Sequence, residues 1–339
     1  MLDIKNETPF EIGVLPGLDK DGCEYAITVI KGTFDIVKDQ DPLPISENQI
    51  PIVYADEYFG EVGISSTKYE SDTCLRKKGT DILLIGHAFP KNGKARMLDV
   101  TLQVGQYKKT IYVFGTRVWY RSIGTWKASD PLPFDKMPLI YEKAFGGEDT
   151  SHSDPQKHSV DKRNPIGTGY SISGDKEKME GLPLPNLEDP RSIIKSWKDK
   201  PPPAGFGFIG RDWLPRANFA GTYDDNWLKT KCPLLPDDFD DLFYNGASSN
   251  LIVNPYLEGG ESVKIVNASR NGNIFFNLPK ISFDISIWFK GERTEYSPIL
   301  DTVIIEPDDQ KIVLIWRSTV LFSREFLYID RVKVQEKSL

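Results

Sequence analysis

The carboxylates between Asp224 and Asp241 come nearest to a catalytic or metal-binding pattern. They form three adjacent pairs, Asp224-Asp225, Asp237-Asp238 and Asp240-Asp241. Paired carboxylates can act as general acid and general base, as in glycan hydrolysis, when rigid structure holds them about 5–10 Å apart. Several carboxylate oxygens can also hold a hard cation. The alternating oxygen ligands closed by a glutamate, which make a calcium loop, are absent from this sequence.

A simpler interpretation accounts for the same aspartates: Asp237 caps a helix, and the others are solvated. On that interpretation we predict no catalytic residue, no metal site and no cofactor. The alternative is a hydrolase, acting on glycan, that uses carboxylates among Asp224, Asp225, Asp237 and Asp240. The two interpretations differ in whether two of these carboxylates converge in one cleft, which depends on the fold.

The histidines lack the partners that metal chemistry requires. A zinc site needs three or four close ligands, whereas His152 and His158 have Asp154 nearby and no cysteine. We therefore expect both histidines at the surface of a polar loop, about 148–161. His87 ends an apolar run, so we expect it to be buried and hydrogen-bonded.

Candidate nucleophiles also lack a suitable context. The serine pairs Ser65-Ser66 and Ser248-Ser249 have no glycine on both sides, which a nucleophile elbow requires. The three cysteines, Cys23, Cys74 and Cys232, are odd in number and widely spaced. This spacing does not suit a secreted disulfide framework, and it favours a reducing compartment.

Residues 201–246 combine many aromatic residues with glycines and prolines, and they follow almost no regular period. Such a segment cannot build its own helix or sheet for most of its length, so it must be pinned onto a core built elsewhere. Trp, Tyr and Arg, the residue types that dominate binding hot spots, gather here. Our candidates for partner binding are Arg211, Trp213, Arg216, Tyr223 and Trp227. We expect core anchoring to take most of these side chains and some to face a partner.

The composition bounds the function classes. The chain has 339 residues, of which 39% are hydrophobic, enough for two domains or one large all-β body. Its net charge of −7 argues against nucleic acid and anionic membrane as main partners, because both attract a positive face. We see no signal peptide and no apolar stretch near the ~18 residues of a membrane helix. We therefore expect a cytoplasmic protein.

Hydrophobic periodicity predicts strands in both terminal thirds. The alternation of Leu98, Val100, Leu102 and Val104 with polar residues indicates a half-buried strand. A tight turn at Gly105-Gln106 returns the chain, so 81–119 should form an antiparallel meander. The strands that we expect cover 27–34, 81–89, 98–104, 107–118, 262–267, 274–278, 281–289, 299–306, 311–318 and about 325–334.

The middle of the chain differs, since 15 of the 24 prolines lie within 131–255. Proline removes a ladder donor, so regular strands cannot run through it. We predict two short helices, over 189–197 and 237–245. The fold class is mainly β: antiparallel, sandwich-like sheets come from the N- and C-terminal thirds, with a long Pro/Gly-rich irregular middle that carries short helices. The expected regions, 1–130, 131–255 and 256–339, should form one compact body.

Ordered motifs along nearly the whole chain resemble one bacterial family, a domain of unknown function typically encoded beside type VI secretion genes. They are V-I-K-G-T-F (29–34), A-D-E-Y-F-G-E (55–61), Y-E-S-D (69–72), G-T-D-I-L-L-I-G-H-A (79–88), V-F-G-T-R-V-W (113–119), S-D-P-L-P-F-D-K-M-P-L-I-Y-E-K-A-F-G-G (129–147), R-N-P-I-G-T-G (163–169), G-L-P-L-P-N-L-E-D-P (181–190), P-P-P-A-G-F-G (201–207), A-G-T-Y-D-D-N-W (220–227) and I-I-E-P-D-D-Q (304–310).

The resemblance implies an accessory role in type VI secretion. Proteins that look like this one are thought to act as adaptors or chaperones. They help to load a toxic effector, often one with a PAAR spike-tip domain, onto the VgrG spike before firing. The resemblance carries over no catalytic residue. We therefore expect a non-enzymatic adaptor whose partners are a PAAR-containing effector, the VgrG spike or both, and a structural part of the secretion apparatus is a further alternative.

Overall fold

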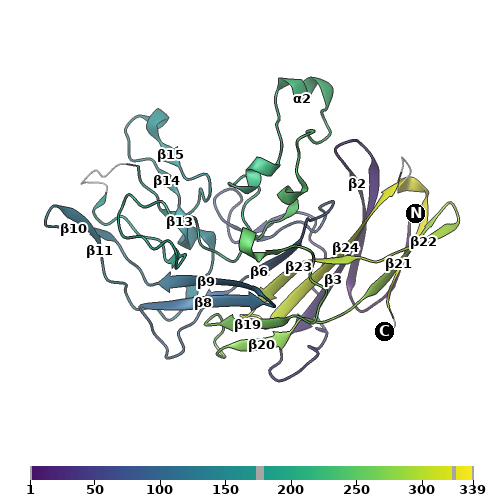
Figure 1. The fold of residues 1–339 in the computed structure, drawn as a ribbon, viewed down its shortest axis with the longest axis horizontal. Coiled ribbons are helices and arrows are strands. Elements are labelled where there is room, and N and C mark those ends of the chain that lie inside the picture. The colour runs from purple at the N-terminus through teal and green to yellow at the C-terminus, as the bar shows by residue number, and fades with distance from the viewer. Residues whose placement is uncertain (1, 173–178, 323–325, 338–339) are drawn as a thin grey trace.

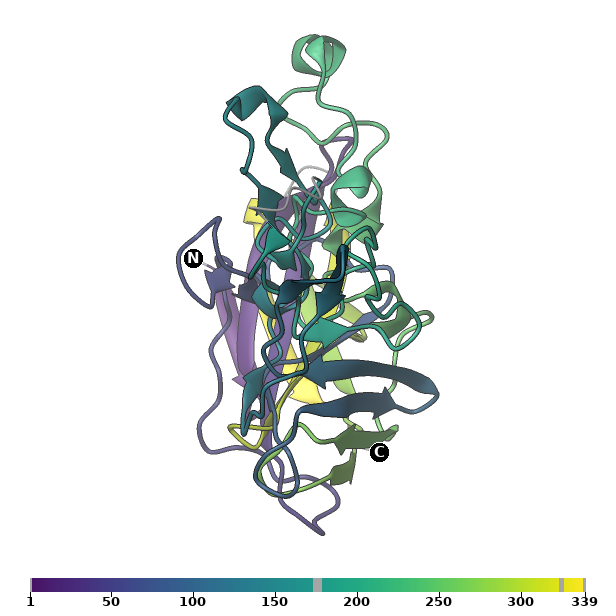
Figure 2. The same cartoon turned by 90° about the vertical axis from the view of Figure 1, so that its left-hand side faces the viewer.

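The protein is mainly β, as its sequence predicts, and its strands form several antiparallel sheets joined by short helices and loops (Figure 1). The structure, a computed structural model, describes residues 2–172, 179–322 and 326–337. Three larger sheets make up the body. Two extensions project from the same side of it: one carries β14 (Glu148–Asp149) and β15 (Ser159–Val160), and the other carries α2 (Asp225–Thr230), at the top of Figures 1 and 2.

The central sheet has six strands in the order β18-β6-β23-β24-β3-β2. Their bounds are Ile252–Val253 for β18, Thr80–Leu84 for β6, Ile299–Glu306 for β23, Lys311–Phe322 for β24, Glu24–Asp35 for β3 and Glu11–Leu18 for β2. β23 pairs with β6 in parallel, and the other neighbours are antiparallel. Strands from the N-terminal third, the middle and the C-terminal third thus share one sheet.

A five-stranded sheet, in the order β17-β9-β8-β19-β20, contains the predicted hairpin. Its strands are β17 (Leu187–Glu188), β9 (Tyr107–Phe114), β8 (Met97–Val104), β19 (Ser262–Val266) and β20 (Ile274–Asn277). The predicted meander over 81–119 is wrong at its first strand, because β6 pairs with β23 and β18 instead. β6 is buried along its whole length, so its continuous apolar run indicates a central position without specifying the partner.

A four-stranded sheet, in the order β1-β25-β21-β22, closes the C-terminal side. Its strands are β1 (Asp3–Glu7), β25 (Ile329–Glu336), β21 (Phe283–Phe289) and β22 (Glu292–Tyr296). The last strand was expected from about Glu325, a residue outside the described part. Phe283 of β21 packs edge-on against Trp316 of β24, with ring centroids 5.0 Å apart, and Phe10 joins the same cluster. These rings join the four-stranded sheet to the central one.

Short pairs and single helical turns complete the fold. The pairs are β4 (Glu57–Tyr58) with β5 (Thr67–Tyr69), β7 (His87–Ala88) with β12 (Met137–Pro138), β10 (Trp119–Ser122) with β11 (Thr125–Ala128), β13 (Phe145–Gly146) with β16 (Thr168–Gly169), and β14 with β15. The 3-10 turns are η1 (Tyr141–Lys143), η2 (Pro155–Lys157), η3 (Arg216–Phe219), η4 (Asp241–Tyr244), η5 (Ser249–Leu251) and η6 (Phe326–Tyr328).

Both predicted helices of the proline-rich middle need correction. Residues 189–197 form turns and bends instead of a helix. There the Asp189 carboxylate accepts from the backbone N–H of Arg191 (2.9 Å), and Glu188 takes the backbone N–H of Ile194 (2.8 Å). Within 237–245 only the four-residue turn η4 forms, and Asp240 caps it. The predicted cap, Asp237, lies outside that turn.

In the described part of the chain, five ion pairs have both side chains buried. They are Lys31–Asp72 (2.9 Å), Lys77–Asp81 (2.8 Å), Arg317–Asp301 (2.6 Å), Arg216–Glu70 and Arg117–Glu188. A buried charge is tolerated when it is paired and hydrogen-bonded, and removing one partner is strongly destabilising. These pairs therefore restrict which segments can lie next to one another.

Three of the five pairs use a residue of one loop, 70–77, between β5 and β6. Glu70 of this loop pairs with Arg216 of the irregular middle, and Asp72 pairs with Lys31 of β3. Lys77 pairs with Asp81 of β6. The backbone carbonyls of the loop also accept from the Arg317 guanidinium of β24. The 70–77 loop thus ties the proline-rich middle to the central sheet.

We predict that Arg216→Met lowers the free energy of unfolding by about 3–5 kcal/mol, because Glu70 is then buried with only the more distant Arg211, 4.0 Å away, as a cation. Arg331→Met is the matched control, since the Arg331–Asp3 pair (2.6 Å) is exposed on both sides. That change should stay below about 1 kcal/mol. Urea unfolding followed by tryptophan fluorescence measures both values. Equal losses in the two variants would contradict the anchoring role of the pair.

Candidate functional site

Two of the predicted partner-binding residues, Trp213 and Arg216, lie inside the protein. The Trp213 side chain is 5% exposed and stands edge-on to the Tyr141 ring, with 5.6 Å between centroids. Gly210 permits this packing, because a Cβ at that position would lie 2.7 Å from the indole. Arg216 pairs with Glu70 and donates to two backbone carbonyls at 2.7 Å each. Both side chains anchor the irregular middle to the body.

Arg211 lies at the edge of the same anchor but remains partly exposed. Its Nη2 atom is 3.0 Å from an oxygen of Asp56 and 4.0 Å from one of Glu70. The guanidinium therefore holds the middle segment against the chain that leads into β4. Its open side is accessible from solvent, unlike Arg216.

Tyr223 and Trp227 lie outside the body on a projecting arm, residues 221–238, which carries α2 at its tip (Figure 1). The Asp224 carboxylate caps α2 by accepting from the Trp227 backbone N–H (2.8 Å). The two rings pack edge to face with centroids 4.7 Å apart. The Trp227 indole N–H donates to the Leu234 carbonyl (2.9 Å), which ties the helix to the returning chain. This leaves Tyr223 53% exposed and Leu228 60% exposed.

The base of the arm is held by side chains of the arm and by the turn between β2 and β3, whose Lys20 Nζ donates to the Asp237 carbonyl (3.1 Å). The Asp238 carboxylate accepts from the backbone N–H of Thr222 (2.9 Å) and from its hydroxyl (2.7 Å). Gly221 has φ of 81°, and a Cβ there would lie 2.8 Å from Asp238. Lys231 pairs with Asp237 at 2.6 Å. These contacts give the arm a defined shape without a hydrophobic core of its own.

The aspartates that could act as acid and base have local roles in this fold. Asp224 caps α2, and Asp240 caps η4 through the backbone N–H of Leu242 (2.8 Å). A hydrogen bond from Lys78 holds the pKa of Asp240 below its usual value. Asp237 is exposed on the arm beside Lys231, and Asp225 follows the cap in the first turn of α2. Among the residues that the structure describes, no group of three or more His, Cys, Asp or Glu could hold a metal ion.

The histidines form local contacts. His158 Nε2 lies 2.9 Å from the His152 carbonyl, and His152 Nδ1 accepts from the Asp154 backbone N–H (3.0 Å), in an exposed loop as expected. His87 is hydrogen-bonded as expected but only half buried, and its Nδ1 lies 2.6 Å from an oxygen of Asp308.

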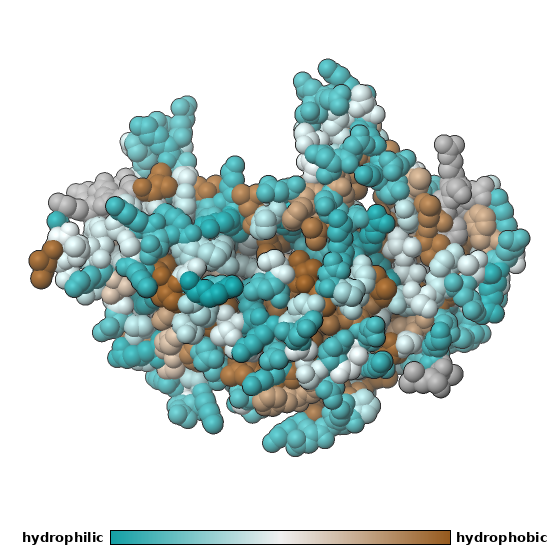
Figure 3. All heavy atoms as spheres, viewed as in Figure 1, coloured by the Kyte–Doolittle hydropathy of each residue, from teal (hydrophilic) through white to brown (hydrophobic). Residues whose placement is uncertain are grey.

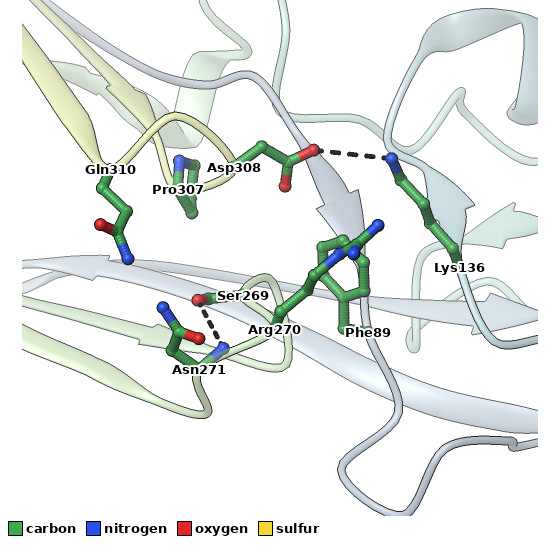
Figure 4. Close-up of a pocket in the computed structure, with 8 residues that line it drawn as sticks. All are labelled: Phe89, Lys136, Ser269, Arg270, Asn271, Pro307, Asp308 and Gln310. Atoms are coloured by element: carbon green, nitrogen blue, oxygen red, sulfur yellow. Dashed lines mark hydrogen bonds and ion pairs between the residues drawn. The ribbon is translucent and has the colours of Figure 1, made fainter.

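Asp308 also lies at the edge of a polar hollow of about 320 Å³ (Figure 4). Lys136 reaches to 4.0 Å from the Asp308 carboxylate, and the Arg270 guanidinium lies 5.3 Å from the centre of the Phe89 ring. His87 completes the environment of this carboxylate. The Asp308 carboxylate, the acidic group of the hollow, is thus already paired with neighbouring side chains. The residues of the hollow form no arrangement that points to a particular reaction.

Sequence reasoning missed a polar pair inside a second, mostly apolar pocket. Lys109 Nζ donates to Ser248 Oγ at 2.8 Å. The signal was present in β9, because Lys109 shares its strand face with the buried Ile111 and Val113. A lysine whose side chain lies on the buried face of a strand indicates a polar site inside the protein. In the other serine pair, the Ser65 hydroxyl donates to the nearby Glu61 carbonyl (2.7 Å) and the Ser66 hydroxyl donates to Glu142 (2.7 Å).

Hydrophobic residues on the face seen in Figure 3 lie in small groups between hydrophilic ones, and the arm projects at the top. In the part of the chain described, no helix is long and apolar enough to cross a membrane. The fold and these surfaces define a mainly β protein with a buried charge network and an ordered, projecting aromatic arm.

The chain belongs to the bacterial family DUF2169, described as an uncharacterized protein conserved in bacteria, whose model matches residues 21–317. The match covers most of the chain, including the 70–77 loop and the arm. No curated protein and no solved structure matches it.

The two tryptophans should differ in what they contribute to stability. Trp213→Ala is expected to lower the free energy of unfolding by about 3–5 kcal/mol, because it empties a buried site. Trp227→Ala should lower it by about 1 kcal/mol or less, because the arm lies outside the hydrophobic core. Urea unfolding of both variants gives the comparison. If Trp227→Ala destabilises as much as Trp213→Ala, the arm is part of the cooperative body.

Proposed function

We propose that this protein is a non-enzymatic adaptor that binds another protein through the 221–238 arm. The observation that supports this most is the Tyr223–Trp227 ring pair, held by a helix cap on an element that projects from the body. An exposed Leu228 lies on the same short helix. Side chains of these types supply much of the energy of protein interfaces.

The rigidity of the arm favours binding. Association costs free energy for every side chain and loop that must be ordered. On the arm, the Asp224 cap, the Trp227–Leu234 hydrogen bond and the Asp238–Thr222 contacts already order the segment. A partner would therefore find the aromatic pair largely in place.

The charge of the arm suggests what kind of surface the partner offers. Residues 221–238 contain four aspartates and two lysines, a net charge of −2 (two minus four). A partner surface with apolar pockets and a basic rim would complement it, because like charges across an interface are unfavourable.

The identity of the partner is proposed from the resemblance of the motifs to type VI secretion accessory proteins. We propose a PAAR-containing effector as cargo, which the adaptor helps to load onto the VgrG spike inside the bacterial cytoplasm. In this role the protein performs no chemistry. The capping roles of Asp224 and Asp240 agree with it, since these carboxylates are occupied in shaping the fold.

Co-purification with a tagged PAAR-containing effector from the neighbouring genes tests the proposal. The wild-type chain should co-purify, and the double variant Tyr223→Ala, Leu228→Ser should lose at least about 90% of the recovered complex, since two hot-spot side chains contribute about 2 kcal/mol or more. The matched control is Tyr120→Ala, Leu132→Ser, which alters side chains 40% and 58% exposed on other elements. No recovery with the wild type, or equal recovery with both double variants, would contradict binding through the arm.

A further inference from the structure

A mostly apolar pocket of about 390 Å³ opens between β9 and the irregular middle. Its walls include Pro202, Pro203, Pro215, Phe219, Leu242 and Ile252. Protein pockets that bind small molecules typically have volumes of about 300–1,000 Å³, and they combine apolar walls with a few convergent polar groups. The proline rings restrict the backbone of this wall.

Among the polar groups that line this pocket, the Lys109 ammonium stands out. Its Nζ donates to the Gly205 carbonyl and to Ser248 Oγ, both uncharged acceptors. Within the described residues, no carboxylate oxygen lies within 4.0 Å of this nitrogen. Burial lowers the pKa of Lys109 to about 8. The amine is therefore mostly charged at neutral pH, and the carboxylate that acts on it, Asp189, is already paired with Arg191.

The other charges around the pocket are matched. Arg191 pairs with Asp189 (2.7 Å), Arg163 pairs with Asp161, and Arg216 pairs with Glu70. Lys109 differs from these three arginines because the atoms that accept hydrogen bonds from its Nζ are neutral, and the Asp189 carboxylate acts on it only from beyond ion-pair distance. An anionic group placed beside it would gain a charge-assisted hydrogen bond in partly desolvated surroundings.

We infer that this pocket binds a small organic acid with a compact apolar body. The body would occupy the proline-lined hollow, and the carboxylate would accept hydrogen bonds from Lys109 Nζ and Ser248 Oγ. This ligand site is separate from the 221–238 arm, and it goes beyond adaptor function.

The binding should depend on pH in a defined direction. A bound carboxylate favours the charged amine, so affinity should be highest where the ligand is ionised and the amine is charged, and it should fall as the pH rises above the pKa of Lys109. The titratable and charged side chains around it are Tyr141, Arg163, Asp189, Arg191 and Arg216. Burial raises the pKa of Tyr141, and the Arg191 hydrogen bond lowers the pKa of Asp189, so neither changes charge near pH 8.

Isothermal titration calorimetry of the full chain with 4-phenylbutyrate tests the inference, with 4-phenyl-1-butanol as the neutral comparison. At pH 7 the acid should bind at least about tenfold more tightly than the alcohol. Lys109→Met should remove that preference. Lys108→Met is the matched control, because its side chain is exposed on the opposite face of β9, and it should bind like the wild type.

A second variant guards against misfolding. Ser248→Ala removes one of the two proposed hydrogen-bond donors, at the start of η5, and should weaken the binding of the acid several-fold. The loss of affinity above about pH 8 is measured on the wild type, so it needs no mutation. Absent binding of 4-phenylbutyrate would overturn the site. So would equal affinity for the acid and the alcohol, or unchanged affinity in a folded Lys109→Met variant.

Discussion

The buried charges of the 70–77 loop are the constraint on which the rest of the structure depends. A proline-rich segment cannot join a sheet through a regular ladder, because proline lacks the backbone donor. The middle joins the sheets only through short strands such as β17 and β18, and buried side-chain charges add to this attachment, with Glu70 pairing with Arg216. The neighbouring Asp72 and Lys77 bind strands of the central sheet at the same time. Since unpaired buried charges are strongly unfavourable, this arrangement excludes most other placements of the middle.

The anchor also decides which aromatic residues remain for a partner. Trp213 is buried against Tyr141, close to the Arg216–Glu70 ion pair, so little of its surface is accessible to a partner. Beyond η3 the chain leaves the body, and Tyr223 and Trp227 are held by local caps on the projecting arm. The order of the chain therefore runs from a buried anchor to an exposed, preorganised element. That sequence of features supports the proposed adaptor role, and the Lys109 pocket lies apart from the arm.

The sequence predicted those parts of the fold where local pattern decides the outcome. Alternation over 98–104 and a Gly105 turn specified the β8–β9 hairpin, and the 307–310 turn was correctly placed between β23 and β24. The partner of β6 was missed because an entirely buried strand carries no face preference. The helix over 189–197 failed where Glu188 accepts from the backbone N–H of Ile194, a group that a helix would bond to the Pro190 carbonyl. Lys109 was overlooked, although it shares alternate positions of β9 with Ile111 and Val113 and so lies on the same, buried face of the strand.

Hydrogen exchange of the chain, alone and in complex with a PAAR-containing effector, tests the central claim most directly. It reports which backbone amides a partner protects, without any substitution. The account predicts new protection within 221–238 and unchanged, already slow exchange in the strands held by the 70–77 loop. Protection confined to other surfaces, with the arm exchanging as freely as in the isolated chain, would contradict it.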